Sequence, residues 1–155
     1  MKETVLTVIF FSFLFGGIFA SKREKRKLEL LAELEKLVLY MGSQIDLYRR
    51  ELIDIYCSFE SELLDKAGFS EKLGEIGFEG AVRHLDLDLE SKRVLCELGS
   101  TLGMLSASEQ KASIDRCATA LALNLDKARS EYPKKRKLYI SFGLMLGAVI
   151  FIIGI

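Results

Sequence analysis

The sequence predicts an all-α protein in which a cytoplasmic antiparallel helical bundle is flanked by an N-terminal and a C-terminal transmembrane helix. Three observations lead to this prediction: an uncharged apolar run at each end of the chain, a basic cluster on the inner side of each run, and a helical apolar stripe between them. The predicted parts are a first transmembrane helix at residues 1–21, a bundle at 22–137 and a second transmembrane helix at 138–155.

The two apolar runs, residues 4–21 and 138–155, contain no Asp, Glu, Lys, Arg or His. A helix of that length spans about 27 Å, close to the roughly 30 Å hydrocarbon core of a bilayer. The first run is alternatively a cleaved signal peptide, but five basic residues follow it and only Lys2, offset by Glu3, precedes it. That charge layout is the reverse of a signal peptide and favours a retained membrane helix.

Basic residues border both runs on the side that faces the middle of the chain. They are Lys22, Arg23, Lys25, Arg26 and Lys27 after the first run, and Lys134, Lys135, Arg136 and Lys137 before the second. Lys and Arg near membrane ends favour the cytoplasmic side, so residues 22–137 are expected in the cytoplasm and both termini on the far side. These basic residues are also the expected contacts with anionic lipid headgroups.

Small residues recur at helical spacing within the runs. Ser12, Gly16 and Ala20 are four apart in the first run, and Gly143 and Gly147 are four apart in the second. This spacing lets helix backbones approach closely in lipid, so these five residues are candidates for membrane helix packing. Glycine is also simply common in membrane helices, and the pattern alone leaves both explanations open.

The composition of the bundle argues against catalysis and against nucleic-acid binding. Residues 28–133 hold 12 basic and 20 acidic residues, an acidic balance suited to solubility or to a basic partner surface. Cys57, Cys96 and Cys117 have no metal-ligand spacing and are expected as reduced, buried thiols. His84 is expected at a surface or helix end, because no nucleophile is motif-linked to it. We therefore expect no enzyme activity, metal or cofactor.

An apolar stripe with helical spacing begins the bundle. Its members are Leu30, Leu34, Leu37, Met41, Ile45, Tyr48, Leu52, Ile55, Phe59 and Leu63. Steps of three and four predict helix rather than strand. The stripe is expected to form two antiparallel helices, divided either at residues 42–43 or at 48–50, with Gly68 ending the second.

Helix-start signals mark the rest of the bundle. After a glycine-broken stretch at residues 70–85, Asp86 or Asp88 is expected to cap a helix that runs through Leu102. Ser106 and Glu109 have the spacing of a capping box, which starts a long helix reaching Pro133. Pro133 is expected to kink a continuous helix or to start a new one where the bundle meets the bilayer.

The C-terminal half resembles the stage III sporulation protein AB family. The resemblance lies in Leu98-Gly99-Ser100-Thr101-Leu102-Gly103, then Gln110 and Ile114, then Lys137-Leu138-Tyr139, Phe142-Gly143 and Gly147. It covers the whole layout, with detailed matches over residues 95–153. Two departures concern local turns: Met104-Leu105-Ser106 replaces a Ser-Asp step, and Arg49-Arg50-Glu51-Leu52 replaces a Thr-Pro-Leu turn.

The resemblance implies a function. Members of this family look like the inner-membrane platform proteins of type II secretion and type IV pilus machines, reduced to one cytoplasmic helical domain. It implies a place in the mother-cell membrane facing the forespore, with a secretion-type ATPase and ring-forming channel proteins as partners, and possible homo-oligomers. The platform would couple the ATPase to membrane channel components without performing chemistry.

Within the resembling region, the paired glycines have two interpretations. The first is close helix packing or a helix end before Ser106. The second is a contact surface for the ATPase or a second copy, formed by Leu98, Gly99, Leu102, Gly103 and Gln110. An alternative function is that of a membrane-anchored adaptor or regulator, whose acidic bundle recruits a soluble partner without an ATPase.

Overall fold

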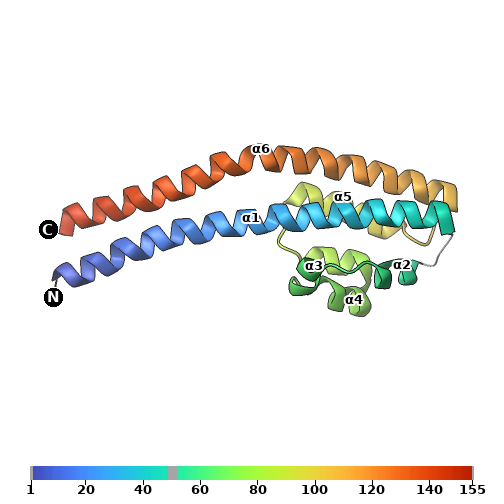
Figure 1. Ribbon diagram of the computed structural model, residues 1–155, viewed down its shortest axis with the longest axis horizontal. Helices are drawn as coiled ribbons and strands as arrows, with labels where there is room; N and C mark the ends of the chain where they lie inside the picture. The colour runs from blue at the N-terminus through green and yellow to red at the C-terminus, as the bar shows by residue number, and fades with distance from the viewer. Residues whose placement is uncertain (1, 49–51, 155) are drawn as a thin grey trace. The chain divides into compact units, whose positions relative to one another are not determined.

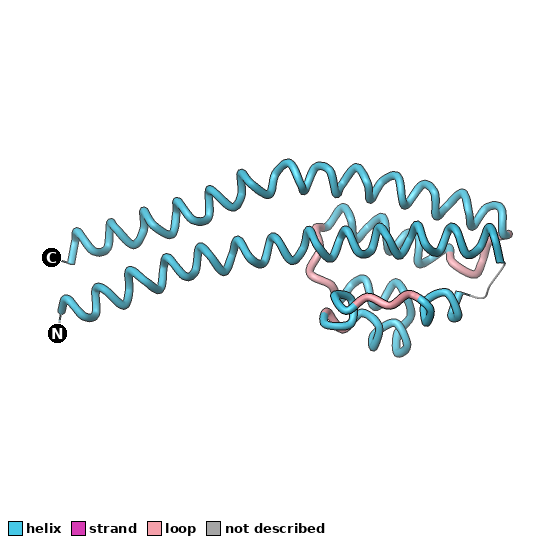
Figure 2. Tube along the Cα trace, in the orientation of Figure 1, coloured by secondary structure: helices cyan, strands magenta, loops and turns pink. Residues whose placement is uncertain are grey.

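The fold is all-α, as the apolar periodicity predicts. The computed structural model describes residues 2–48 and 52–154, and within these ranges it contains helices and loops but no strand (Figures 1 and 2). The helices are α1 (Lys2–Tyr48), α2 (Leu52–Ser58), α3 (Glu62–Lys66), α4 (Phe69–His84), α5 (Leu89–Thr101) and α6 (Ala107–Gly154).

The chain divides into two compact units. Unit 1 combines Met1–Leu28 with Lys127–Ile155, and unit 2 is Glu29–Asp126. The helices α1 and α6 contribute to both units, because neither is interrupted at the boundary. The packing boundary therefore lies inside two continuous helices, several residues from the sequence-based limits at 21 and 137.

The core of unit 2 is built on the predicted apolar stripe. Helix α1 contributes side chains that are at most 9% exposed: Leu30, Leu31, Leu34, Leu37, Val38, Met41 and Ile45. Helix α6 contributes a second stripe with the same steps of three and four: Ile114, Cys117, Ala118, Leu121 and Leu125. Burying one Leu or Ile side chain is worth about 1.5–3 kcal/mol, so these two stripes supply much of the driving force for folding this unit.

The division expected at residues 42–43 is wrong. Gly42 lies inside α1, and a Cβ atom placed on it would be 3.2 Å from Cγ2 of Ile114. Ser43 does not cap a helix there, because its hydroxyl donates to the carbonyl oxygen of Tyr40 (2.7 Å). Gly42 is thus a point of close approach between α1 and α6. The alternative division at residues 48–50 agrees with the end of α1 at Tyr48, and residues 49–51 lie outside the described ranges.

The expected second helix is divided into α2 and α3. Ser61 has extended backbone and caps α3, since its Oγ accepts from the N–H of Leu64 (3.4 Å) and donates to Oε2 of Glu33 (3.2 Å). Gly68 follows α3 with φ of 76°, in the left-handed region that glycine tolerates best. The predicted end at Gly68 is therefore confirmed, while the unbroken helix before it is wrong.

The stretch at residues 70–85, expected to be broken by glycines, is helical as far as His84 and has one break. It forms α4, with a kink at Gly77, where φ is 74° and ψ is 179°. Four buried side chains, Phe69, Phe78, Ala81 and Val82, hold α4 against the rest of unit 2. The glycines count against a helix in isolation, but this apolar face outweighs that preference.

The two helix starts after α4 agree with the sequence. Of the two candidate caps, Asp88 is the one that caps α5: its Oδ2 accepts from the N–H of Ser91 (2.8 Å). At the start of α6 the N–H of Ser106 donates to Oε2 of Glu109 (3.1 Å), and the N–H of Glu109 donates to Oγ of Ser106 (3.4 Å). Hydrogen bonds from the Ser106 hydroxyl and backbone lower the pKa of Glu109.

The prediction of membrane-spanning helices gains no support from the structure. Within the described part of the chain, no helix has a stretch that is both long and apolar enough to cross a membrane. At Pro133 α6 continues as one helix, so the proline does not start a new helix.

The Asp88 cap provides a direct test of this fold. We predict that Asp88→Ala lowers the free energy of unfolding by about 1 kcal/mol, because an orphan N–H at the start of α5 loses its acceptor. The expected shift in the thermal midpoint is about 4–8 °C for a domain of this size, measured by circular dichroism on the detergent-solubilised full chain. Asp88→Asn keeps an acceptor and is the control. An Asp88→Ala variant as stable as the wild type would contradict the assigned cap.

Candidate functional site

The first candidate site is the helix pair formed within unit 1 by the two ends of the chain. The blue start of α1 and the red end of α6 run side by side (Figure 1). A Cβ atom placed on Gly17 would lie 2.6 Å from the backbone oxygen of Tyr139, and one placed on Gly143 would lie 2.8 Å from that of Phe13. Backbone approaches backbone at these positions, and only glycine leaves room for it.

The residues at this crossing overlap only in part with those expected from the sequence. Gly143 and Gly147 are buried, and a Cβ atom on Gly147 would lie 2.8 Å from the ring of Phe10. In the first segment, Gly17 makes the close approach, while Gly16 is exposed and has open space around its Cα. Stepping by four from Ser12 therefore selects a face of α1 other than the one on which Gly17 approaches α6.

The other expected packing residues, Ser12 and Ala20, lie outside this contact. Ser12 is exposed and its hydroxyl donates to the carbonyl oxygen of Val8 (2.9 Å), within its own helix. Ala20 is half-buried, and its neighbour Ser21 is only 6% exposed. The contact stripe on α1 thus consists of Phe10, Phe13, Leu14 and Gly17. Each of them has an atom within 4 Å of a Cβ atom placed on Gly143 or Gly147 of α6.

The basic residues that border the apolar ends lie on the surface of unit 1. All nine are exposed except Lys27, which is half-buried beside Glu24 with an Nζ–Oε1 distance of 3.0 Å. Lys135 joins the two helices, lying 3.7 Å from Glu24 on α1 and 3.3 Å from Glu131 on its own helix. Glu24 is therefore the acid that links the two basic clusters.

The second candidate is the glycine region at the end of α5, where the five proposed partner-contact residues have different environments. Leu98 is 2% exposed, so its side chain is part of the core. A Cβ atom on Gly99 would lie 3.0 Å from Phe78 and 3.2 Å from the backbone nitrogen of Glu79. Gly99 is therefore where α5 packs closely against α4.

The remaining three of these residues lie at the turn from α5 into α6. Leu102 is the C-cap of α5, and its N–H donates to the carbonyl oxygen of Leu98 (3.1 Å). Gly103 follows with φ of 82°, a left-handed conformation that ends the helix. Gln110 is half-buried in the first turns of α6. Close packing and a helix end account for both glycines, and a partner surface here stays a prediction.

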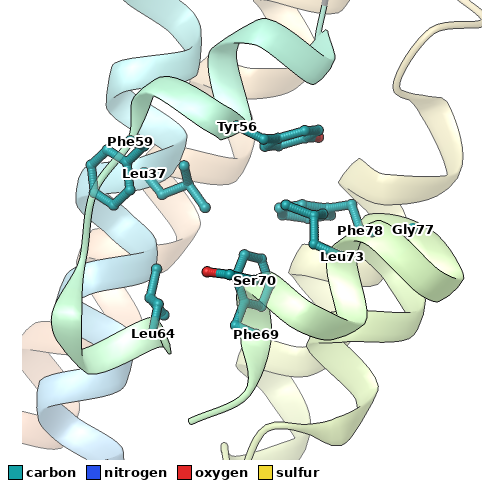
Figure 3. Close-up of a pocket in the computed structure, with 10 residues that line it drawn as sticks. Leu37, Tyr56, Phe59, Leu64, Phe69, Ser70, Leu73, Gly77 and Phe78 are labelled. Atoms are coloured by element: carbon teal, nitrogen blue, oxygen red, sulfur yellow. The ribbon is translucent and has the colours of Figure 1, made fainter. Parts of the chain in front are cut away.

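The third candidate is an apolar pocket of about 520 Å³ in unit 2, which the sequence reasoning missed. It opens between α2, α3 and α4, with Leu37 of α1 at its back (Figure 3). The rings of Tyr56 and Phe78 lie nearly parallel, with centroids 5.7 Å apart and planes at 19°. Phe69 meets Phe78 edge-on at 5.9 Å. The available signal was the cluster of aromatic residues Tyr56, Phe59, Phe69 and Phe78, of which the predicted apolar stripe includes only Phe59.

The histidine and the described cysteines lie in different surroundings. His84 is exposed in the last turn of α4, as expected for a helix-end histidine. Cys117 is a buried free thiol near the carbonyl oxygen of Val94 (3.9 Å), and burial, with a smaller contribution from Glu97, raises its pKa to about 12. Cys96 is half-buried and free, and the side chain of Cys57 lies outside the described ones. Among the described residues, no three His, Cys, Asp or Glu side chains are grouped to hold a metal ion.

Comparison with known proteins gives a match to a family model. The family model described as stage III sporulation protein AB matches residues 2–155, which covers nearly the whole chain. A search of curated proteins and a search of solved structures each find no match.

Gly16 and Gly17 form a matched pair for testing the helix crossing. We predict that Gly17→Leu separates the two helices, because its side chain would collide with the backbone of Tyr139, whereas Gly16→Leu has open space and leaves them together. Overpacking of this kind costs about 1–3 kcal/mol. The measurement is the electron–electron distance between spin labels at the exposed positions Val8 and Val149 in lipid nanodiscs. Equal distances in the two variants would contradict the assigned face.

Proposed function

Since the chain belongs to the stage III sporulation protein AB family, we propose that this sporulation protein is a membrane platform component of a secretion or channel complex. In this proposal it couples a cytoplasmic secretion-type ATPase to ring-forming channel proteins and performs no chemistry itself. The single observation that supports a membrane location is the exposed apolar surface of unit 1. This surface surrounds the pair of helices that approach each other at Gly17 and Gly143.

That surface consists of large apolar side chains that the helix crossing leaves uncovered. On α1 the most exposed are Phe19 at 73% and Phe15 at 64%, and on α6 Ile152 at 72%. Water-exposed apolar surface of this extent marks an interaction site, and a lipid environment suits it because the small-residue crossing at Gly17 and Gly143 needs no hydrophobic driving force from water. We propose that residues 4–21 and 138–155 insert into the membrane as a helical pair.

The orientation follows from the charges next to these segments. The exposed basic residues of unit 1 favour the cytoplasmic side and anionic headgroups. Unit 2 would then lie in the cytoplasm, with both termini across the membrane, in the mother-cell membrane facing the forespore. The placement in the mother-cell membrane draws its support from the family resemblance.

The coupling role draws support from the continuity of the long helices. Helix α6 runs through Pro133 without interruption, and α1 likewise passes from unit 1 into unit 2. A force applied to the bundle would reach the membrane segments through two helices rather than through a flexible linker. A recruiting adaptor without an ATPase is the second candidate function, favoured by the acidic balance of the bundle.

Cysteine labelling tests the proposed topology. In a chain whose native cysteines are replaced, we expect a single cysteine at position 2 to react with a membrane-impermeant maleimide in intact cells. A single cysteine at Met104, which is 85% exposed, should react only after permeabilisation. The protein should also stay in the membrane pellet after carbonate extraction. Labelling of position 104 from outside, or release by carbonate, would contradict the proposal.

A flexible insertion tests the coupling. We predict that a Gly-Ser stretch between Tyr132 and Pro133 strongly reduces sporulation while membrane insertion, bundle helicity and partner binding persist, because it breaks the continuity of α6. The same stretch inserted between Gly103 and Met104, in the turn before α6, is the control and should be tolerated.

The outcome separates the two candidate functions. Full sporulation with the insertion at Tyr132 contradicts coupling and favours passive recruitment. Co-purification of a secretion-type ATPase with the tagged full chain from sporulating membranes supports the platform, and its absence favours the adaptor.

A further inference from the structure

The pocket in unit 2 is open space that the fold itself does not need. Its wall includes Leu64, Leu73 and Phe78, and its volume of about 520 Å³ far exceeds the packing defects usual in a domain core. Figure 3 shows these side chains around a gap between α3 and α4, with the Tyr56 ring closing one side. Burial raises the pKa of Tyr56, in keeping with an apolar wall.

Two glycines line the pocket. A Cβ atom placed on Gly74 or on Gly77 would have no atom within 4 Å. Gly77 has positive φ, which explains a glycine there by backbone geometry. Gly74 has no such reason, because it lies in the helical part of α4 and no neighbour is close to it. A glycine in a helix interior is unfavourable relative to alanine, and at Gly74 no packing contact within the chain offsets that cost.

The surroundings of the pocket are acidic. Residues 52–84 contain seven Asp and Glu side chains but only three Lys and Arg side chains. Each of these three basic side chains already has an acidic partner in its own helix: Lys66 with Glu62 (2.6 Å), Lys72 with Glu75 (2.5 Å) and Arg83 with Glu79 (2.6 Å). The segment therefore has an excess of negative charge towards solvent.

Several of these acids adjoin the lining directly. Exposed Glu60 follows Phe59, and exposed Glu71 follows Ser70. Asp65 accepts a hydrogen bond from the Ser70 hydroxyl, which lines the pocket. An apolar cavity with a negative border is complementary to a ligand with an apolar group and positive charges beside it.

We propose that this pocket docks a leucine or aromatic side chain from a basic amphipathic helix of a partner protein. The apolar face of such a helix supplies the side chain that fills the space beside Gly74, and its Lys and Arg residues meet Glu60, Asp65 and Glu71. The proposal concerns a surface of unit 2 and is independent of whether the partner is an ATPase or whether unit 1 spans a membrane.

The test uses the full chain in a neutral detergent and a synthetic peptide. The probe is a fluorescein-labelled amphipathic helix with leucine and one phenylalanine on its apolar face and lysine and arginine on its polar face. We expect saturable binding by fluorescence anisotropy above the signal from empty micelles. A peptide with glutamate in place of lysine and arginine should not bind, and salt should weaken binding of the basic peptide.

Gly74→Leu is the decisive variant, because it adds a large side chain at the wall of the pocket without backbone strain. It should weaken peptide binding by about tenfold or more, equivalent to about 1.4 kcal/mol. The matched control is Ala112→Leu on the exposed face of α6, which adds similar bulk away from the pocket and should leave binding unchanged. Circular dichroism confirms that both variants are folded, and the milder Gly74→Ala replaces Gly74→Leu if the latter is not.

Charge reversal tests the acidic border. Glu60→Lys combined with Glu71→Lys should weaken binding of the basic peptide by about tenfold, whereas Asp115→Lys combined with Glu97→Lys, on other exposed surfaces, should not. A benzophenone at the phenylalanine position of the peptide should cross-link to residues between 56 and 78.

Three results would overturn the proposal. The first is equal peptide affinity in the wild type and Gly74→Leu, or cross-links outside residues 56–78. The second is that another copy of this chain occupies the pocket. In that case the wild type would self-associate and bind no peptide, and Gly74→Leu would abolish the self-association. The third is a lipid chain in the pocket, seen as binding of dodecanoate that Gly74→Leu abolishes while the peptide does not bind.

Discussion

The contact between the apolar stripes of α1 and α6 in unit 2 is the interaction on which the rest of the bundle depends. On α1 the side chains of Leu34, Val38 and Met41 are fully buried. On α6 those of Leu121 and Leu125 are at most 1% exposed. The short helices α2 and α3 are each less than three turns long and cannot be stable alone, so they need this framework to pack against. Gly42 lets the two long helices meet at Ile114. Leu37 of α1 lines the pocket, and Thr101, beside the glycine turn, has its hydroxyl 3.2 Å from that of Ser113 on α6.

The sequence predicts this framework well where the signal is local. A capping residue and its partner lie three positions apart, so Asp88 with Ser91, and Ser106 with Glu109, are readable without tertiary structure. The all-α class and the buried stripe of α1 follow from helical periodicity in the same way. The family resemblance, read from residues 95–153 in detail, agrees with the match over residues 2–155.

The errors concern glycines, whose effect depends on what lies opposite. Gly42 reads as a helix break but is a packing contact with Ile114, and Gly17 rather than Gly16 makes the crossing in unit 1. Neither could be assigned without knowing the facing helix. Gly68, Gly77 and Gly103 adopt positive φ. Gly68 was expected at a helix end, as was Gly103 in one of its two interpretations, and Gly77 lies in the stretch expected to be broken by glycines. The pocket escaped notice because it is bordered by residues from several helices, and no single period connects them.

The exposed apolar surface of unit 1 and the apolar pocket of unit 2 differ in the charges around them. This difference favours a different binding partner for each surface. The apolar side chains of unit 1 adjoin exposed Lys and Arg residues, which anionic lipid headgroups attract. The pocket of unit 2 adjoins Glu60, Asp65 and Glu71, which the same headgroups repel. A negatively charged bilayer surface therefore suits the first and disfavours the second. Apolar surface bordered by acids is better matched by a protein with basic side chains. The apolar surface of unit 1 and the pocket of unit 2 are therefore suited to different partners. The proposed platform function requires that separation, because in this proposal the protein remains in the membrane while it exchanges contacts with a soluble component.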